Sequence, residues 1–411
     1  MKMNTKKIFI PEYYELIDMM GKETKATDLH VTFRERDIKS LYNGIAIEIV
    51  QEELCQLSCE WCYINQCKKE KLNKPLDFMK FKIIVDKIND YNERYNVKLF
   101  SNIIFIGGEP TINTELDKMI EYSLKSDLTP IIVTNGVKLV DMEYARKICL
   151  DGVKITIHLP LFGENGEDIL DKATHKGGYS QGLKQAIRNL LDLKEEGRNI
   201  EIVGELVVCQ TTKMYAYDSY VYCRTNGIVP FLEFMRISND SYTNKHLLLN
   251  RTDICELSNK LYAYDLEQGF VTDDVCNKVC YFLPPAVNSP CTLIQNSIHI
   301  KYEKDGFGKV ISCCGQSINH GNIMVDSLED ILEHKKNTKI FSEQKAYIKG
   351  PCSVCKLYDL TGCEGGCRGN AKNTFDCAEA SDPQCIFIAP EVSKNKEIMT
   401  LERQYLIKED M

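Results

Sequence analysis

Cysteine placement constrains this chain more than any other feature of its sequence. Nineteen of the 411 residues are cysteine, and most of them fall into three groups. The first group is Cys55, Cys59, Cys62 and Cys67, the second is Cys276, Cys280, Cys291, Cys313 and Cys314, and the third is Cys352, Cys355, Cys363, Cys367, Cys377 and Cys385. Grouped cysteines in a chain without a secretion signal are typical of metal ligands rather than of disulfides. The scattered cysteines are predicted to be buried structural thiols: Cys149, Cys209, Cys223 and Cys255.

Composition excludes several classes of protein. The formal net charge is −8 at pH 7, which argues against a chain whose main partner is nucleic acid. Residues 1–10 lack the apolar run of a secretory signal, and no later run approaches the ~18 apolar residues that a membrane-spanning helix needs. The sequence therefore predicts a cytoplasmic protein with neither nucleic acid nor membrane as a partner.

Residues 44–236 alternate short β-rich runs with longer amphipathic stretches, which is the pattern of βα units around a parallel sheet. We expect strands at Gly44–Val50, Asn102–Ile106, Pro130–Thr134, Val153–His158, Glu201–Val208 and Val229–Met235. Helices are expected at Asp77–Tyr95, Asn113–Lys125, Asp141–Leu150, Tyr179–Glu196 and Lys213–Thr225. Six strands of this kind favour an α/β fold that forms a partial (β/α)6 barrel.

The chain is predicted to have three parts. Residues 1–43 form an N-terminal leader segment, and residues 44–240 form the barrel. Near residue 240 the periodicity weakens and the cysteines take over, so residues 241–411 are expected to form a C-terminal domain of irregular α+β structure.

The first cysteine group follows the first predicted strand directly. The run Cys55-Gln-Leu-Ser-Cys59-Glu-Trp-Cys62 has the spacing C-x3-C-x2-C. Three thiolates in one tight loop suit three irons of a [4Fe–4S] cluster and leave the fourth iron open to another ligand. A zinc loop with Cys67 as fourth ligand is the alternative that the spacing leaves.

The run Gly107-Gly108-Glu109-Pro110 follows the second predicted strand. A glycine pair lets the backbone approach a ligand closely, and Glu109 places a carboxylate at the carboxyl end of a parallel strand, where barrel enzymes have their sites. Taken alone, the run is also compatible with an ordinary turn.

Together the two motifs resemble the radical S-adenosylmethionine superfamily, in which C-x3-C-x-aromatic-C holds the cluster and GGEP binds the methionine amino group of the cofactor. Trp61 supplies the aromatic residue, and the resemblance covers about residues 44–236. It implies that S-adenosylmethionine contacts Gly107, Gly108, Glu109, Pro110, Thr134, Asn135, Thr156 and Glu205. For the last four of these, an ordinary polar residue at a strand end is the alternative.

The resemblance also implies the chemistry. S-adenosylmethionine would chelate the open iron, and an electron from the reduced cluster would cleave it to a 5′-deoxyadenosyl radical that abstracts hydrogen from a substrate. Cofactor and metal carry this chemistry, while the protein orients them and excludes water. A low-potential electron donor of the flavodoxin or ferredoxin type is implied as a partner.

The later cysteines resemble the SPASM extension of radical S-adenosylmethionine enzymes, which carries two auxiliary [4Fe–4S] clusters. The resemblance assigns Cys352, Cys355, Cys363 and Cys385 to one cluster, and Cys291, Cys313 and Cys367 to the other. Cys280 is the first candidate for the remaining ligand, with Cys276, Cys314 or an open iron as alternatives, and the role of Cys377 stays open. Sixteen residues between Cys291 and Gly308, and seven between Cys355 and Cys363, exceed the usual spacings by short loop insertions. A zinc ribbon built from the C-terminal cysteines is the alternative metal site.

The sequence thus predicts a radical S-adenosylmethionine iron–sulfur oxidoreductase. Because enzymes with the SPASM extension mostly modify peptides, the expected substrate is a peptide or protein that is crosslinked or oxidised on a side chain. A dehydrogenase of a small-molecule alcohol, such as a sugar or aminocyclitol, is the second hypothesis. A zinc-stabilised interaction protein with a degenerate barrel is the hypothesis outside enzymes.

Overall fold

A computed structural model of the chain describes most of its central part and segments of its C-terminal part. The described residues are 44–51, 54–62, 74–158, 166–236, 246–273, 281, 297–303, 306–313, 316–338, 348, 351–355 and 365–386. By contact density the chain divides into two compact units, which are described separately. One unit comprises residues 39–247 and 292–342, and the other comprises residues 1–38, 248–291 and 343–411.

Six parallel strands in chain order form the centre of the first unit. They are β1 (Gly44–Val50), β2 (Asn102–Gly107), β3 (Thr129–Thr134), β4 (Lys154–His158), β5 (Glu201–Val208) and β6 (Val229–Phe234). Each strand pairs in parallel with the next. All six predicted strands are therefore confirmed to within one or two residues at each end, and with them the partial barrel.

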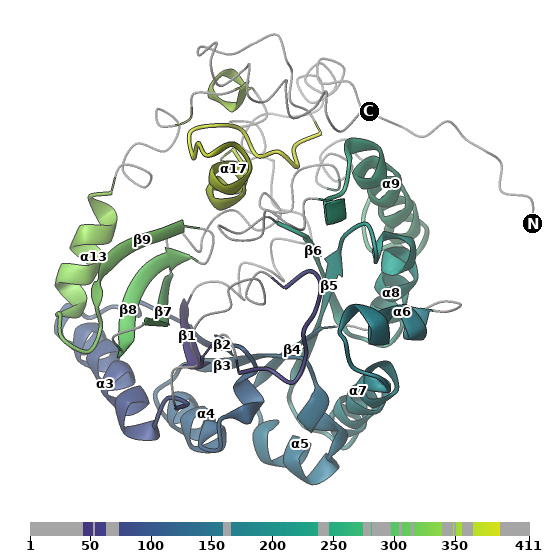
Figure 1. The fold of residues 1–411 in the computed structure, drawn as a ribbon. Coiled ribbons are helices and arrows are strands. Elements are labelled where there is room, and N and C mark those ends of the chain that lie inside the picture. The colour runs from purple at the N-terminus through teal and green to yellow at the C-terminus, as the bar shows by residue number, and fades with distance from the viewer. Residues whose placement is uncertain are drawn as a thin grey trace, which may run out of the picture. The chain divides into compact units, whose positions relative to one another are not determined.

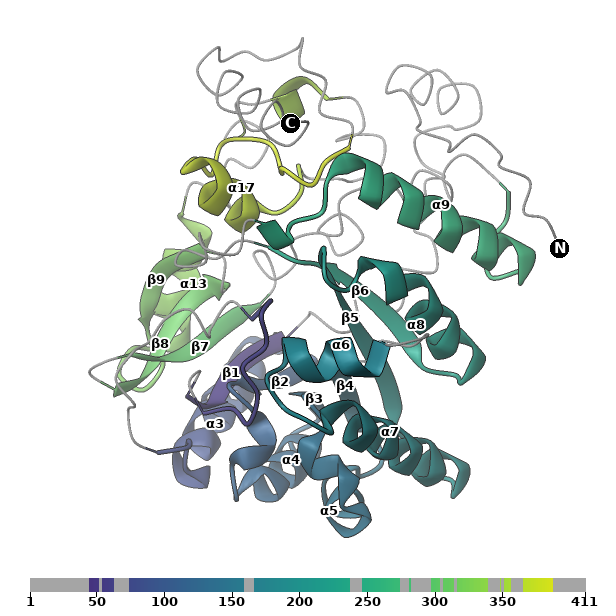
Figure 2. The same ribbon diagram turned by 45° about the vertical axis from the view of Figure 1, so that its right-hand side comes forward.

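Helices cover the outer side of this curved sheet (Figures 1 and 2). They are α3 (Phe78–Tyr95), α4 (Leu116–Lys125), α5 (Met142–Ile148), α6 (Gly166–Ala173), α7 (Tyr179–Glu195) and α8 (Lys213–Thr225), with 3-10 turns η1 (Pro110–Ile112) and η2 (Val137–Val140). The predicted starts at Asp77 and Asp141 are N-caps, because each carboxylate accepts a backbone N–H of the following turn. Helix α7 buries the predicted apolar stripe that includes Leu183, Ile187 and Leu190.

Three further strands extend the sheet beyond β1, and the sequence pattern did not indicate them. They are β7 (Ile298–Glu303), β8 (Gly306–Cys313) and β9 (Gln316–Asn322), followed by α13 (Leu328–Lys336). β7 pairs in parallel with β1, and β8 and β9 continue antiparallel, so the sheet order is β6-β5-β4-β3-β2-β1-β7-β8-β9. Glu48 of β1, which is buried, accepts the backbone N–H of Tyr302 and lies 3.1 Å from the ring nitrogen Nε2 of His299.

The second unit contains α9 (Arg251–Glu267), the turn η4 (Pro351–Val354) and α17 (Arg368–Phe375). Residues 292–342 belong to the barrel unit, although they fall within the predicted C-terminal range 241–411. Cys149, Cys209, Cys223 and Cys255 are all fully buried, which confirms the prediction of structural thiols. Among the described residues, no helix has both the length and the apolar character to cross a membrane.

Candidate active site

The cysteine loop leaves the carboxyl end of β1 and is held in place by a second loop. The backbone N–H of Ser58 donates to the carbonyl of Thr174 at 3.1 Å, and that of Glu60 donates to the carbonyl of Ala173 at 2.9 Å. Cys55, Cys59 and Cys62 are each partly accessible, and none of them forms a disulfide. The C-terminal end of α6 and the next residue therefore fix the backbone of the loop while leaving its thiols within reach of a ligand.

The two glycines after β2 allow this loop to pass very close to the backbone. A Cβ on Gly107, whose φ is +129°, would lie 1.9 Å from the carbonyl oxygen of Val50. A Cβ on Gly108 would lie 2.3 Å from the carbonyl oxygen of Leu54. The sequence indicated close approach to a ligand, whereas the close neighbour seen here is the chain segment that leads into Cys55.

Glu109 is almost completely buried, and its carboxylate accepts four hydrogen bonds. Oε1 accepts from the backbone N–H of Thr111 at 3.0 Å, the hydroxyl of Thr111 at 2.6 Å and the hydroxyl of Thr134 at 2.7 Å. Oε2 accepts from the backbone N–H of Asn135 at 2.7 Å. Burial raises the pKa of Glu109, and the hydrogen bonds from Asn135, Thr111 and Thr134 act in the opposite direction. The carboxylate therefore ties the end of β3 to the turn after β2.

Asn135 joins this carboxylate to the cysteine loop. Its side-chain Nδ2 lies 3.5 Å from Cys55 Sγ and 3.1 Å from Gln56 Oε1, in donor geometry to both. Its carbonyl accepts the hydroxyl of Tyr179 at 2.8 Å. Gly107, Gly108, Glu109, Pro110, Thr134 and Asn135, which the sequence proposed as one site, are thus brought together beside Cys55. The contributions of Gln56 and Tyr179 were missed, because nothing in their spacing marks them.

The donor set of the loop fits an iron–sulfur cluster. Burial, together with the neighbouring thiols, raises the pKa of Cys59, and burial also raises the pKa of Cys55. Thiols of this kind ionise when a metal binds them, because the metal stabilises the thiolate. Among the described residues, no group of three or more His, Cys, Asp or Glu side chains is arranged to hold a single metal ion. In a cubane cluster, by contrast, each thiolate binds its own iron.

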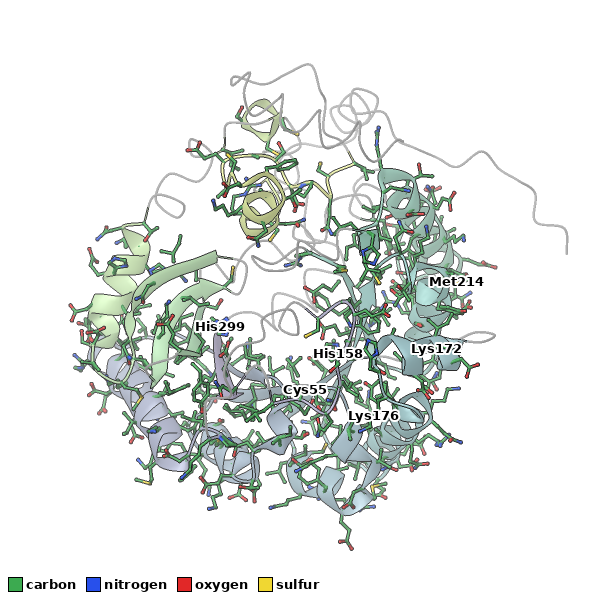
Figure 3. All side chains as sticks on the ribbon, viewed as in Figure 1. Cys55, His158, Lys172, Lys176, Met214 and His299 are labelled. Carbon is green, nitrogen blue, oxygen red and sulfur yellow. The ribbon has the colours of Figure 1, made fainter. Side chains whose placement is uncertain are left out.

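The inner face of the sheet carries the remaining two residues of the expected cofactor site. Thr156 on β4 and Glu205 on β5 are both buried. They project from the face opposite to Ile157, which lies beside Leu183 of α7 on the helix-covered side. In Figure 3, Cys55 and His299 lie toward the inner side of the curved sheet and Met214 lies on the outer helix α8. Thr156 and Glu205 contact neither Glu109 nor Asn135 in any described hydrogen bond.

A set of hydrogen bonds holds two of the C-terminal cysteines in place within the second unit. The backbone N–H of Cys352 donates to Ser381 Oγ at 3.2 Å, and that of Cys367 donates to Asp382 Oδ2 at 2.7 Å. Asp382 also accepts from Asn370 Nδ2 at 2.9 Å. Cys352 in turn η4 and Cys367 before α17 are therefore hydrogen-bonded to two adjacent residues of the segment that leads to Cys385.

Cys280, Cys291 and Cys363 lie outside the described residues, as do the alternatives Cys67, Cys276 and Cys314. Cys313 is buried at the end of β8 in the barrel unit. The assignment of individual cysteines to the two auxiliary clusters stays a prediction.

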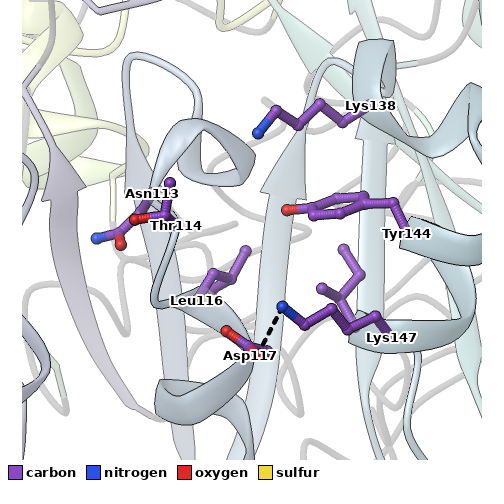
Figure 4. A pocket seen from close by; sticks show the side chains of 8 residues that line it. Asn113, Thr114, Leu116, Asp117, Lys138, Tyr144 and Lys147 are labelled. Carbon is purple, nitrogen blue, oxygen red and sulfur yellow. Dashed lines mark ion pairs between the residues drawn. The ribbon is translucent and has the colours of Figure 1, made fainter.

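A cavity of about 220 Å³ lies on the outer side of the barrel unit, beside α4 and α5 (Figure 4). Both of its lysines have partners: Lys147 pairs with Asp117 at 2.8 Å, and the Lys138 ammonium lies 5.3 Å from the centre of the Tyr144 ring. It shares no lining residue with the cysteine loop. We therefore place the candidate active site at the loop and not at this cavity.

Known proteins are similar to this chain in the region of the two motifs and over most of its length. The family model described as a 4Fe-4S single cluster domain matches residues 45–175. The mycofactocin maturase MftC of Mycolicibacterium smegmatis is 23% identical over 352 residues, which cover 83% of each chain. The Fe-coproporphyrin III synthase of Methanosarcina barkeri is 27% identical over 378 residues, covering 82% of this chain and 86% of that enzyme. The structure of anSMEcpe with bound AdoMet and Cp18Cys peptide aligns with a TM-score of 0.60 at 16% identity, over 89% of this chain and 98% of that one.

These similarities and the geometry of the loop define an iron–sulfur enzyme built on a partial α/β barrel. The similarities support a radical S-adenosylmethionine enzyme with a SPASM-type C-terminal region. Its cofactors are accordingly a [4Fe–4S] cluster that binds S-adenosylmethionine, S-adenosylmethionine itself and auxiliary iron–sulfur clusters.

Proposed function

We propose that this enzyme oxidatively modifies a peptide or protein, either by forming a crosslink or by oxidising a side chain. The observation that carries the proposal is similarity over nearly the whole chain, C-terminal region included, to a maturase and to an enzyme that was solved with a peptide bound. A low-potential electron donor and a cytoplasmic location belong to the same proposal. The enzyme class does not depend on the identity of the substrate.

Within this proposal Cys55, Cys59 and Cys62 hold the cluster that binds S-adenosylmethionine. When bound, the cluster and cofactor supply the 5′-deoxyadenosyl radical that removes a hydrogen atom from a substrate carbon. The chain fixes the loop backbone through the carbonyls of Ala173 and Thr174. It thereby restricts the positions of the three thiols before any metal binds.

Glu109 and Asn135 orient the side of the site that faces the cofactor. Because Glu109 already accepts four protein hydrogen bonds, we propose that its first task is to hold Thr134 and Asn135 in place. The backbone of Gly107 and Gly108 and the remaining acceptor capacity of the carboxylate then bind the ammonium of S-adenosylmethionine. Pro110 begins the turn η1, which places Thr111 over the carboxylate.

We propose that the later cysteines hold two auxiliary clusters. Cys352, Cys355, Cys363 and Cys385 would hold one cluster, and Cys280, Cys291, Cys313 and Cys367 would hold the other. Support comes from the anchoring of Cys352 and Cys367 on the segment before Cys385. Both residues are buried, as is typical of structural cluster ligands.

The test is product analysis with candidate peptides. Short peptides encoded beside the gene are incubated anaerobically with the reconstituted enzyme, S-adenosylmethionine and dithionite, and mass spectrometry follows both 5′-deoxyadenosine and the peptide. We expect one peptide to lose two hydrogens, with the Cys59→Ala variant as the inactive control. Formation of 5′-deoxyadenosine with every such peptide unchanged contradicts the proposal.

A small-molecule substrate is the second candidate, because the relative from Methanosarcina barkeri is named for a porphyrin product. A sugar or aminocyclitol alcohol belongs to the same alternative. Conversion of a porphyrin or of an alcohol in the same assay, with no peptide converted, would favour this candidate.

A further inference from the structure

A cluster of ionisable side chains lies on the inner face of β4, β5 and β6, outside the hydrogen-bond network of Glu109. His158 of β4 and Glu205 of β5 are direct neighbours in the sheet, and Glu205 Oε2 lies 3.3 Å from His158 Nδ1. Glu205 is hydrogen-bonded to Glu233 of β6. Arg236 follows β6 and lies 3.5 Å from Glu233. Three adjacent strands therefore bring one imidazole, two carboxyl groups and one guanidinium together.

Two atoms of this cluster lack a hydrogen-bond partner. His158 Nδ1 and Glu205 Oε2 are both buried, and neither makes a hydrogen bond among the described residues despite their 3.3 Å separation. Buried polar atoms of stable proteins are nearly always satisfied, so an unsatisfied pair points to a group that binds there. The His158 side chain is 39% exposed and the Glu205 side chain 10%, so a ligand can approach the pair from the exposed side of the imidazole.

The surroundings shift the pKa values of the two carboxyl groups in opposite directions. Burial and the adjacent Glu233 raise the pKa of Glu205 well above its usual range. Burial opposes ionisation of Glu233 too, but Arg236 and the hydrogen bond from Glu205 lower the pKa of Glu233 overall. Burial lowers the pKa of His158, so the ring is neutral at pH 7 and its unprotonated nitrogen can accept a proton. Neighbouring groups whose environments push their pKa values apart are typical of acid–base sites.

The other charged groups on this face are already paired. Lys154 of β4 forms an ion pair with Glu201 of β5 at 3.2 Å, near the opposite end of both strands. Strand β3, which packs against β4, contributes no charged side chain. Within the described residues, the charged groups near His158 are therefore Glu205 and Glu233, and Arg236 is paired with Glu233.

We propose that His158, Glu205 and Glu233 form an acid–base site that accepts a proton from a hydroxyl, thiol or amide group of the substrate. The inference rests on the proposed function only in placing the substrate on the inner face of the barrel. His158 is the proton acceptor, and Glu205 and Glu233 are positioning residues that stabilise the imidazolium. It assigns Glu205 to the substrate rather than to S-adenosylmethionine.

The proton transfer from the substrate to His158 needs no further reactant. The bond between the substrate heteroatom and its hydrogen breaks, the electron pair stays on the heteroatom, and the proton moves to the free nitrogen of His158. No electron enters or leaves the cluster of side chains. The imidazolium lies beside Glu205 and the negative charge of Glu233, and it returns the proton to solvent when the product leaves.

Infrared spectroscopy of the reconstituted full-length enzyme tests the protonated carboxyl of Glu205 without a substrate. We expect a band of one buried protonated carboxyl at pH 7 that shifts in D2O and is absent from Glu205→Gln. Glu201→Gln, on the same face of the same strand, should keep the band. In Glu233→Gln the band should disappear at lower pH than in the wild type, because the negative neighbour is gone. A band that survives in Glu205→Gln overturns the proposal.

The pH dependence of stability gives a second readout. A carboxyl whose pKa is higher in the folded than in the unfolded state stabilises the fold at low pH, and this contribution is lost as the pH rises through the folded pKa. The urea midpoint of the wild type should therefore fall relative to that of Glu205→Gln as the pH rises from the ordinary carboxyl pKa of 4.5 through the folded-state pKa of Glu205. Parallel curves for the two proteins contradict the assignment.

Coupling of the reaction tests the role toward substrate. With a peptide that the wild type converts, His158→Gln should lower the modified peptide formed per 5′-deoxyadenosine at least tenfold, and Glu205→Gln should shift the pH profile of this ratio. Unchanged ratios and profiles overturn the proposal. So does a loss of S-adenosylmethionine affinity of tenfold or more in Glu205→Gln, because that result returns Glu205 to the cofactor. Where no peptide is converted, the proposed function fails while the infrared and stability readouts still decide on the proton site.

Discussion

Replacing Gly108 with alanine is the sharpest test of how the site is built. The added Cβ would lie 2.3 Å from the carbonyl oxygen of Leu54, 2.6 Å from its carbonyl carbon and 2.7 Å from the carbonyl oxygen of Gln51. All three atoms belong to backbone, so no side-chain rotation can relieve the contact. To reach an ordinary van der Waals distance, the segment before Cys55 must move by about 1 Å.

The structure gives the size of the effect. Overpacking of this kind costs about 1–3 kcal/mol of folding stability. A shift of about 1 Å at Leu54 passes directly to Cys55, whereas functional geometry tolerates only about 0.5 Å. We therefore expect Gly108→Ala to lower iron incorporation at this loop and to slow S-adenosylmethionine cleavage by about a hundredfold.

The assay compares this variant with Gly182→Ala in helix α7. A Cβ at Gly182 would meet only Val140 Cγ2, at 3.5 Å, which is an ordinary contact. Alanine in a helix interior should stabilise the control by about 0.5–1 kcal/mol. Urea unfolding, iron content after anaerobic reconstitution and the rate of 5′-deoxyadenosine formation are measured for both. If Gly108→Ala loses stability but keeps the iron content and the rate of the control, the clash is absorbed elsewhere and the reasoning is refuted.

Three further outcomes follow from the same contacts. Cys59→Ala should abolish S-adenosylmethionine cleavage and lower iron by about four of about twelve atoms per chain, since the ligand sets are separate; metal analysis and product assay check this. Asn135→Ala removes the donor to Cys55 Sγ and should lower the midpoint potential of the cluster by about 20–60 mV, read by redox titration followed by electron paramagnetic resonance; an unchanged potential contradicts the contact. Asp382→Asn should cost about 1.5–3 kcal/mol, because an amide cannot accept from both Cys367 and Asn370 as the carboxylate does, whereas Asp376→Asn, at an exposed site, should leave the unfolding midpoint nearly unchanged; equal midpoints for the two variants would contradict the role of Asp382.

The barrel was predictable because its strands and helices are regular. β1 and β5 have the predicted ends, since each is a short apolar run followed by a clear change of pattern. β7 was not predictable in the same way, because its inner face carries His299 and Lys301 rather than apolar residues. Their partner Glu48 is more than two hundred residues away in sequence, so no local pattern relates them.

The candidate site was predictable in its motifs and not in its contacts. Cys55 and Glu109 were found from their motifs, but the donors to Glu109 come from two separate places. Thr111 lies in the turn η1, and Thr134 and Asn135 lie at the end of β3. His158 and Glu233 carry a signal that strand alternation could have shown. Both lie on the face that also carries Thr156 and Glu205, because side chains alternate along a strand.

The motifs act as one unit because each constrains the next. Gly108 lets the segment before Cys55 pass beneath the turn after β2, and Glu109 in that turn holds Asn135. The side-chain amide of Asn135 in turn donates toward Cys55 Sγ, so the contacts lead from the loop through Gly108, Glu109 and Asn135 back to the loop. A change at any member therefore reaches the cysteines through backbone or hydrogen bonds over only a few ångströms. The strict local spacing of C-x3-C-x2-C and GGEP is thus a consequence of packing as well as of ligand chemistry, since the turn after β2 packs directly against the backbone that leads to Cys55.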